Sequence, residues 1–107
     1  MSRYEVKFTG NAVNDFQLIS TWYAAKSIVA EAKWIAAVEK ALDLLERNPL
    51  QFARVLDADL QSLNLQQINL GAGRQLTHRM VFATRPTKVV VHAIRHLSQD
   101  ALTTDDI

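Results

Sequence analysis

The chain has 107 residues, of which 49% are hydrophobic and 21% are charged, and its formal net charge is +1. These values are typical of one globular domain and exclude a disordered chain. Without cysteine there is no disulfide or thiolate, and without a long apolar run we expect one cytoplasmic domain over residues 1–107 and no membrane partner.

The first half of the chain predicts a strand followed by two helices. Residues 4–8 alternate apolar and polar side chains, which is typical of a strand with one buried face. The segment Thr9-Gly10-Asn11 can cap a first helix, in which apolar side chains recur every three or four positions and which is expected to end near Ala25. Ser27 can cap a second amphipathic helix, which Pro49 stops. Two helices with so short a joint form a hairpin that can cover a sheet.

The second half predicts a loop and three strands. Residues 50–64 lack a regular periodicity, so we expect a loop with one helical turn there. The strands are expected at residues 67–70, 77–84 and 88–94. Pro86 favours a hairpin turn between the last two strands, and because residues 89–91 are apolar on both faces, the last strand should be central. The fold class is therefore α+β, β-α-α-β-β-β, with a helical hairpin on a small, mainly antiparallel sheet and a frayed tail at 101–107.

The charge distribution singles out the last strands. No acidic residue occurs between Asp59 and Asp100, an interval that holds five basic side chains and all three histidines. This part of the molecule should carry a positive potential that suits an anionic partner. In the alternative interpretation, its arginines pair with carboxylates of a covering helix, for which Glu39, Asp43 and Glu46 are the candidates.

The last two strands are expected to bring basic side chains together. If residue 84 pairs with residue 88 across the turn, His78 lies opposite Ile94. This pairing gathers four side chains at one end of the sheet, namely His78, Arg79, Arg95 and His96. Such a cluster is suited to binding a phosphate or a carboxylate.

The histidines alone predict neither a metal centre nor a hydrolytic triad. Strand alternation should place His92, Ile94 and His96 on one face, but the histidine spacing matches no zinc pattern. We therefore expect no metal and no cofactor. Ser98, His96 and Asp100 are the residue types of a triad, but residues this close along a strand end do not readily adopt its geometry.

The order and spacing of the C-terminal segments resemble the ParE/RelE superfamily of bacterial toxins from toxin–antitoxin modules. The similarity covers nearly the entire chain. Its most specific parts are residues 68–71, 78–82 and 89–100, which resemble two strands of the family and its ending with His96 and Asp100. The resemblance implies the RelE/ParE-like fold and, as function, the toxin of a type II plasmid-stabilisation module.

The resemblance also implies a partner. A small ParD/RelB-like antitoxin would wrap its C-terminal segment around the helical hairpin and the sheet and so neutralise the toxin, and the two proteins can form a heterotetramer. The expected apolar docking sites for that segment are the aromatic side chains of the two helices, Phe16, Trp22, Tyr23 and Trp34.

Two activities exist in the superfamily. RelE-like members cut mRNA on the ribosome with a set of basic residues, whereas ParE-like members do not cut RNA and are associated with inhibition of DNA gyrase. This chain has Gln67 and Asn69 where RelE-like nucleases place lysines, and Gln99 where an arginine is expected. It keeps only Arg79 of the nuclease set. The resemblance therefore favours a ParE-like toxin that binds its target, with gyrase as the candidate, and that is not an enzyme.

Three interpretations of the C-terminal residues follow. In the ParE-like interpretation, the target-binding surface comprises His78, Arg79, Arg95, His96 and Gln99. In the RelE-like alternative, a ribosome-dependent mRNA endoribonuclease, His96 is the general base and Arg79 and Arg95 bind phosphate. The third interpretation is a non-toxic interaction module with the same fold.

Overall fold

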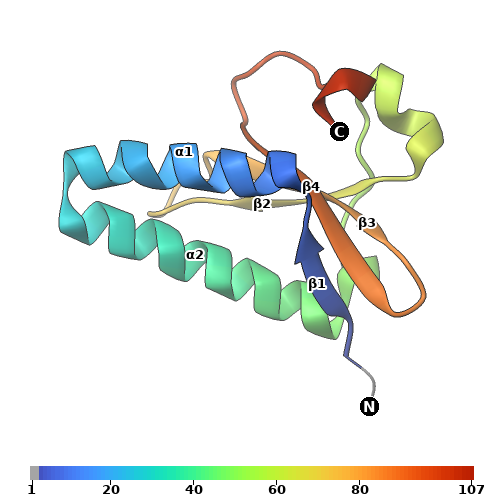
Figure 1. Ribbon diagram of the computed structural model, residues 1–107, viewed down its shortest axis with the longest axis horizontal. Helices are drawn as coiled ribbons and strands as arrows, with labels where there is room; N and C mark the ends of the chain where they lie inside the picture. The colour runs from blue at the N-terminus through green and yellow to red at the C-terminus, as the bar shows by residue number, and fades with distance from the viewer. Residues whose placement is uncertain (1–2) are drawn as a thin grey trace.

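A helical hairpin covers one face of a four-stranded sheet in the computed structural model, which describes residues 3–107 (Figure 1). The order β-α-α-β-β-β and the α+β class are as predicted. The elements are β1 (Glu5–Phe8), α1 (Gly10–Lys26), α2 (Ile28–Arg47), β2 (Gln66–Leu70), β3 (His78–Thr84) and β4 (Lys88–His96). Short 3₁₀ segments lie at Pro49–Gln51, Ala58–Leu63 and Thr104–Asp106. No helix within residues 3–107 is long and apolar enough to cross a membrane.

The capping residues expected from the sequence define where both helices begin. The hydroxyl of Thr9 accepts a hydrogen bond from the backbone N–H of Ala12 at 3.2 Å. The N–H of Ser27 donates to the carbonyl of Tyr23 at 3.1 Å, and the Ser27 hydroxyl accepts from the N–H of Ala30 at 2.9 Å. One residue therefore ends the first helix and caps the second, which folds the hairpin back sharply.

The strands are arranged in the order β1-β4-β3-β2. β1 runs parallel to β4, and the other neighbouring pairs are antiparallel, so the sheet is mainly antiparallel. β4 is an inner strand, as its apolar residues 89–91 predicted, and Val89 and Val91 are fully buried under the helices. Figure 1 shows β1 beside β4 and the hairpin formed by β3 and β4.

The register of the β3–β4 hairpin differs from the prediction, because His78 lies opposite His96 instead of Ile94. The turn between the strands is one residue longer than we assumed, and a β-bulge adds one further residue, His92, to β4. The bulge interrupts the alternation of side chains, so that Val91 and Ile94 both contribute to the apolar cluster under the helices. The strict alternation expected across His92 is therefore wrong.

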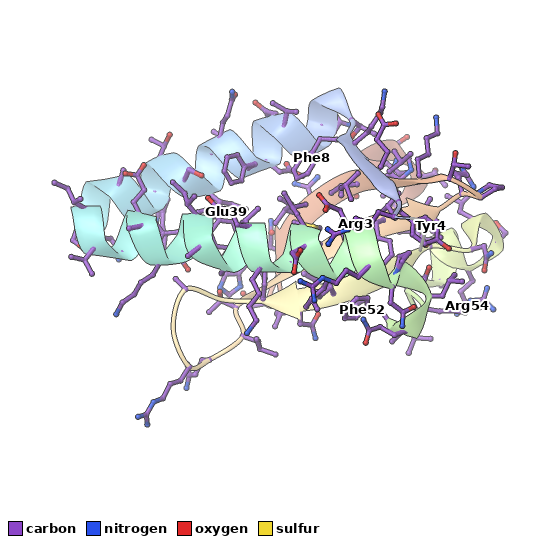
Figure 2. All side chains as sticks on the ribbon, turned by 90° about the horizontal axis from the view of Figure 1, so that it is seen from below. Arg3, Tyr4, Phe8, Glu39, Phe52 and Arg54 are labelled. Atoms are coloured by element: carbon purple, nitrogen blue, oxygen red, sulfur yellow. The ribbon has the colours of Figure 1, made fainter. Side chains whose placement is uncertain are left out.

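Two apolar clusters fill the two faces of the sheet. The larger one lies under the helices and contains the fully buried Trp34, Leu45 and Phe82. Phe52 packs edge-on against Phe82 with 6.3 Å between the ring centroids, and Figure 2, which views the molecule from the side of α2, shows Phe52 beside the C-terminal end of that helix. The smaller cluster on the opposite face consists of Val55, Leu60, Leu65, Val81, Ala83, Ala93 and Leu102.

The C-terminal residues 101–107, which we expected to be frayed, cover this second face of the sheet. Leu102 is only 3% exposed in the smaller cluster, and its N–H donates a hydrogen bond to the carboxylate of Asp57 at 2.7 Å. Thr103 and Asp106 form a capping box on the last 3₁₀ segment. In Figure 1 this red segment lies beside the yellow-green segment of residues 58–63. The expectation was wrong because the buried Leu102, with the partly buried Ile107 packed against the same cluster, anchors the segment.

Candidate functional site

The four basic side chains expected to cluster do meet at the end of the β3–β4 hairpin. His78 pairs directly with His96, and Arg79 pairs directly with Arg95. Because successive residues of a strand point to opposite faces, the two histidines lie on the helix-covered face and the two arginines are directed away from it. The expected cluster therefore forms one end of the sheet but divides between two surfaces.

Arg79 is held in a bidentate ion pair with Asp57. The two guanidinium nitrogens donate to the two carboxylate oxygens at 2.7 and 2.8 Å, and the side chains are only 12% and 10% exposed. The hydrogen bonds from Arg79 lower the pKa of Asp57 to about 2, and the hydrogen bonds to Asp57 raise the pKa of Arg79. Since Asp57 also binds the N–H of Leu102, the pair ties β3 to the C-terminal segment. Arg79 is thus engaged within the protein.

Arg95 lies between two carboxylates. It donates to Asp15 of α1 at 3.4 Å and to Asp106 near the C-terminus at 3.3 Å. The other carboxylate oxygen of Asp15 accepts the backbone N–H of Ile94 at 3.0 Å. β1 pairs with β4 only as far as Val91, so the carboxylate of Asp15 supplies the hydrogen-bond acceptor for the N–H of Ile94 beyond that point. The same carboxylate orients Arg95.

Arg79 and Arg95 are paired with carboxylates, as the alternative interpretation of the basic stretch predicted. The partners are not the expected Glu39, Asp43 and Glu46 of α2. Asp43 and Glu46 instead pair with exposed arginines near the start of the chain and on α2 itself, and Figure 2 labels Arg3, whose guanidinium lies 3.2 Å from the Glu46 carboxylate. The actual partners come from a loop, from α1 and from the C-terminal tail, and the sequence pattern did not reveal them.

His78 is a buried, uncharged member of an aromatic cluster. His78 is only 6% exposed, and its Nδ1 lies 2.8 Å from the hydroxyl of Thr77. The ring centroid of His78 lies 5.0 Å from those of Trp34 and His96 and 6.4 Å from that of Tyr23. Burial, followed by the proximity of His96, lowers the pKa of His78 to about 4. His78 is therefore neutral near pH 7.

His96 is exposed and is oriented by a tight turn. Its Nδ1 accepts the backbone N–H of Ser98 at 3.1 Å and lies 2.7 Å from the Ser98 hydroxyl. Its own backbone N–H donates to the side-chain oxygen of Gln99 at 2.8 Å. Ser98 and His96 do come into contact, which we did not expect from their closeness along the chain. Because Nδ1 accepts a backbone N–H, the neutral ring carries its proton on Nε2.

The positions that carry lysines in RelE-like nucleases are neutral and are engaged with each other. The amide nitrogen of Gln67 donates to the side-chain oxygen of Asn69 at 3.1 Å. The amide oxygen of Gln67 in turn accepts from Arg79 at 3.1 Å. This edge of the sheet therefore presents amides in place of free cations.

The four aromatic residues expected to dock an antitoxin are not equally accessible. Trp34 is fully buried and Tyr23 is 8% exposed, and their rings stack at 5.4 Å in the core. Phe16 is half-buried and packs against the same core. Only Trp22, at 55%, presents an open surface. Leu18 and Val29 are also exposed, and they could have been found from the sequence as apolar side chains outside the inward stripe of each helix. Ile28, which we expected in the inward stripe of the second helix, is 85% exposed at the first position of α2.

A small groove connects the two predicted surfaces. It has a volume of about 230 Å³ and is lined by Leu18, Ile19 and Trp22 of α1 and by His78 and His96 at the end of the hairpin. A second hollow of about 240 Å³ shares all of these residues except Trp22 and extends to Asp15, Ile94, Arg95 and Gln99. We call the first hollow the histidine groove. It brings one expected antitoxin contact, Trp22, next to two expected target contacts.

Comparison with known families agrees with the fold. Residues 6–101 match the family described as the ParE toxin of the type II toxin-antitoxin system, parDE. Among curated proteins no sequence matches the chain. The family match runs from β1 past the end of β4 and includes every residue of the histidine groove. The resemblance found in the sequence is confirmed, and the chain belongs to the ParE toxin family of type II toxin–antitoxin systems.

Proposed function

We propose that the protein is a toxin that acts by binding a protein target and does not cut RNA. The observation that carries this proposal is the state of the arginines: Arg79 and Arg95 are both held by carboxylates of the same chain. An anionic RNA backbone would have to compete with these carboxylates for the same guanidinium groups.

RNA cleavage needs a general base and a cation that stabilises the charge developing on the phosphate. His96 is the candidate base, but its Nδ1 is occupied by the turn that ends at Gln99. The cations nearest to it along the hairpin are engaged, and Gln67 and Asn69 supply none. The arrangement therefore favours recognition of a protein surface over phosphate chemistry.

The proposed target surface is the exposed turn at the end of β4. His96 and Gln99 are exposed and are fixed by their hydrogen bonds, and Leu97 between them is 42% exposed. The ring of His78 lies 5.0 Å from that of His96, and Arg79 and Arg95 lie opposite each other at the neighbouring position of the hairpin. DNA gyrase is the candidate target, by analogy with other ParE-like toxins.

A cognate ParD/RelB-like antitoxin is the proposed neutralising partner. Two accessible apolar residues of α1, Leu18 and Trp22, line the histidine groove next to the proposed target surface. An antitoxin segment bound there would cover His96 and block the target. A heterotetramer of two toxins and two antitoxins is a compatible assembly.

The proposal is tested by induction of the protein in a bacterial host, combined with supercoiling of relaxed plasmid by purified gyrase. We expect growth arrest and inhibition of supercoiling. The double variant His96→Gln with Gln99→Ala should need at least about tenfold more protein for the same inhibition, a loss of about 1.4 kcal/mol in binding. The matched control Lys88→Gln removes an exposed cation at the other end of β4 and should leave inhibition unchanged.

Other outcomes would support the other interpretations. Growth arrest with cleaved mRNA and unaffected gyrase would exclude the binding mechanism in favour of a RelE-like endoribonuclease. Harmless expression, with neither gyrase inhibition nor RNA cleavage, would support the third interpretation, a non-toxic interaction module.

A further inference from the structure

The histidine groove has the dimensions and lining of a seat for one side chain. Its volume of about 230 Å³ exceeds the roughly 150 Å³ of an apolar protein cavity that holds benzene. Three of its five lining residues are apolar, with Leu18 and Trp22 exposed at 63% and 55% and free to cover an occupant. The buried His78 forms the floor. A bulky aliphatic or aromatic side chain suits this space.

Lys26 lies at the rim of the groove and forms no ion pair within residues 3–107. The ammonium of Lys26 lies 4.3 Å from the centre of the Trp22 ring. At the opposite end, Arg95 is already paired with the carboxylates of Asp15 and Asp106. The cation left open to a partner is therefore Lys26, whose charge is complementary to an acidic residue.

The two histidines are the titratable groups that line the groove itself. Their rings meet edge to face at 5.0 Å, with Thr77 bound to one and Ser98 to the other. The other titratable groups around them are Tyr23 in the core, Lys26 above Trp22, and the Asp15–Arg95 pair in the adjoining hollow. An apolar occupant would remove water from both rings. A protonated imidazole would then be a buried charge without a carboxylate of its own, which is strongly unfavourable.

We propose that the histidine groove seats one bulky apolar side chain of the antitoxin, next to an acidic residue that meets Lys26, and that seating requires both histidines to be neutral. This inference rests on the proposed function for the identity of the occupant. It adds the chemistry of the recognised segment and a dependence on pH, so that acidification weakens the complex and uncovers His96.

The test uses a displayed library of short random peptides, selected on the full chain at about pH 7.5, with affinities measured by fluorescence polarisation. We expect the enriched peptides to place Leu, Phe or Trp beside Asp or Glu. Trp22→Ala should weaken their binding at least about tenfold, and Lys26→Gln should weaken it severalfold. The control variants Leu56→Ala and Lys88→Gln remove an exposed leucine and an exposed cation away from the groove and should bind as the unchanged protein does.

The pH dependence is measured with the same peptides. Between about pH 7.5 and about pH 5.5, the affinity should fall about tenfold. His96→Gln removes the exposed imidazole and should bind at both pH values with nearly equal affinity. A selection that yields no peptide, peptides that bind Trp22→Ala equally well, or an unchanged pH dependence in His96→Gln would overturn the proposal.

These results are independent of the growth and gyrase experiments. A toxin that arrests growth but binds no peptide in the groove would refute the seat and keep the proposed function. A harmless protein whose groove selects apolar-acidic peptides would keep the seat and refute the proposed function.

Discussion

Arg79 on β3 and Asp57 in the loop before β2 form a doubly hydrogen-bonded ion pair at 2.7 and 2.8 Å in a nearly buried setting. Asp57 also accepts the backbone N–H of Leu102. A single carboxylate thus joins three segments that are distant in sequence. The arginine that the sequence offered as a phosphate or target ligand instead holds the second face of the sheet together.

Replacement of Asp57 by asparagine should therefore destabilise the protein strongly. Asp57→Asn leaves the Arg79 charge buried without its partner, and the cost of breaking a buried pair in this way is about 3–5 kcal/mol. Urea unfolding of the variant measures this loss. The matched control is Asp43→Asn, which removes a 45% exposed partner of Arg47 and should cost less than about 1 kcal/mol. Equal losses in the two variants would show that the Asp57 pair contributes no more than a surface pair.

Acid should destabilise the protein through His78. Because the folded state holds the pKa of His78 at about 4, below the usual 6.5, the unfolded chain binds more protons between these two values. The stability is fully present above about pH 6.5 and falls as the pH is lowered toward 4, by up to about 3 kcal/mol. Burial also lowers the pKa of His92, which acts in the same direction.

Urea unfolding measured in steps across this pH range checks the prediction. The variant His78→Gln should show a clearly shallower dependence on pH, whatever its stability at pH 7. A dependence as steep as that of the unchanged protein would assign the acid sensitivity to other groups. At lower pH a second loss is expected, because the pKa of Asp57 is lowered to about 2 and its contribution disappears as the pH falls from 3.8 toward that value.

The C-terminal segment should contribute to stability through the buried Leu102. Leu102 is 3% exposed, so Leu102→Ala leaves a cavity against Val81 and Ala93 and should cost about 2–5 kcal/mol. Leu56→Ala truncates a leucine that is 79% exposed and should change the free energy of unfolding by less than about 0.5 kcal/mol. Thermal unfolding of both variants gives the comparison. If Leu102→Ala were as mild as Leu56→Ala, the tail would not be packed as described.

Local sequence signals were sufficient for most of the fold. The alternation in residues 4–8, the caps at Thr9 and Ser27 and the stop at Pro49 depend on neighbouring residues, and these elements are found where expected. The central position of β4 followed from its apolar residues on both faces. What could not be predicted depends on contacts between distant residues. The bulge at His92 shifted the hairpin register, and Leu102 turned an apparently loose tail into a covering segment.

The candidate site was predicted in composition but not in arrangement. His78, Arg79, Arg95 and His96 do gather at one sheet end, since strand pairing alone determines that. Whether the arginines are free to bind a partner depends on the carboxylates that pair with them. Such pairs join distant residues, since Asp57 lies more than twenty positions from the arginine it binds. Burial of Trp34 could not be distinguished from docking by periodicity, because an inward stripe and a binding stripe have the same spacing.

We propose that the exposed turn at His96 binds a protein and cuts no RNA. The most direct test incubates the purified protein with translating ribosomes and a defined mRNA, and maps the ends of the mRNA afterwards. We expect the mRNA to stay intact at protein concentrations that inhibit gyrase supercoiling. Cleavage of the mRNA by the unchanged protein, lost in His96→Gln and retained in Lys88→Gln, would contradict it.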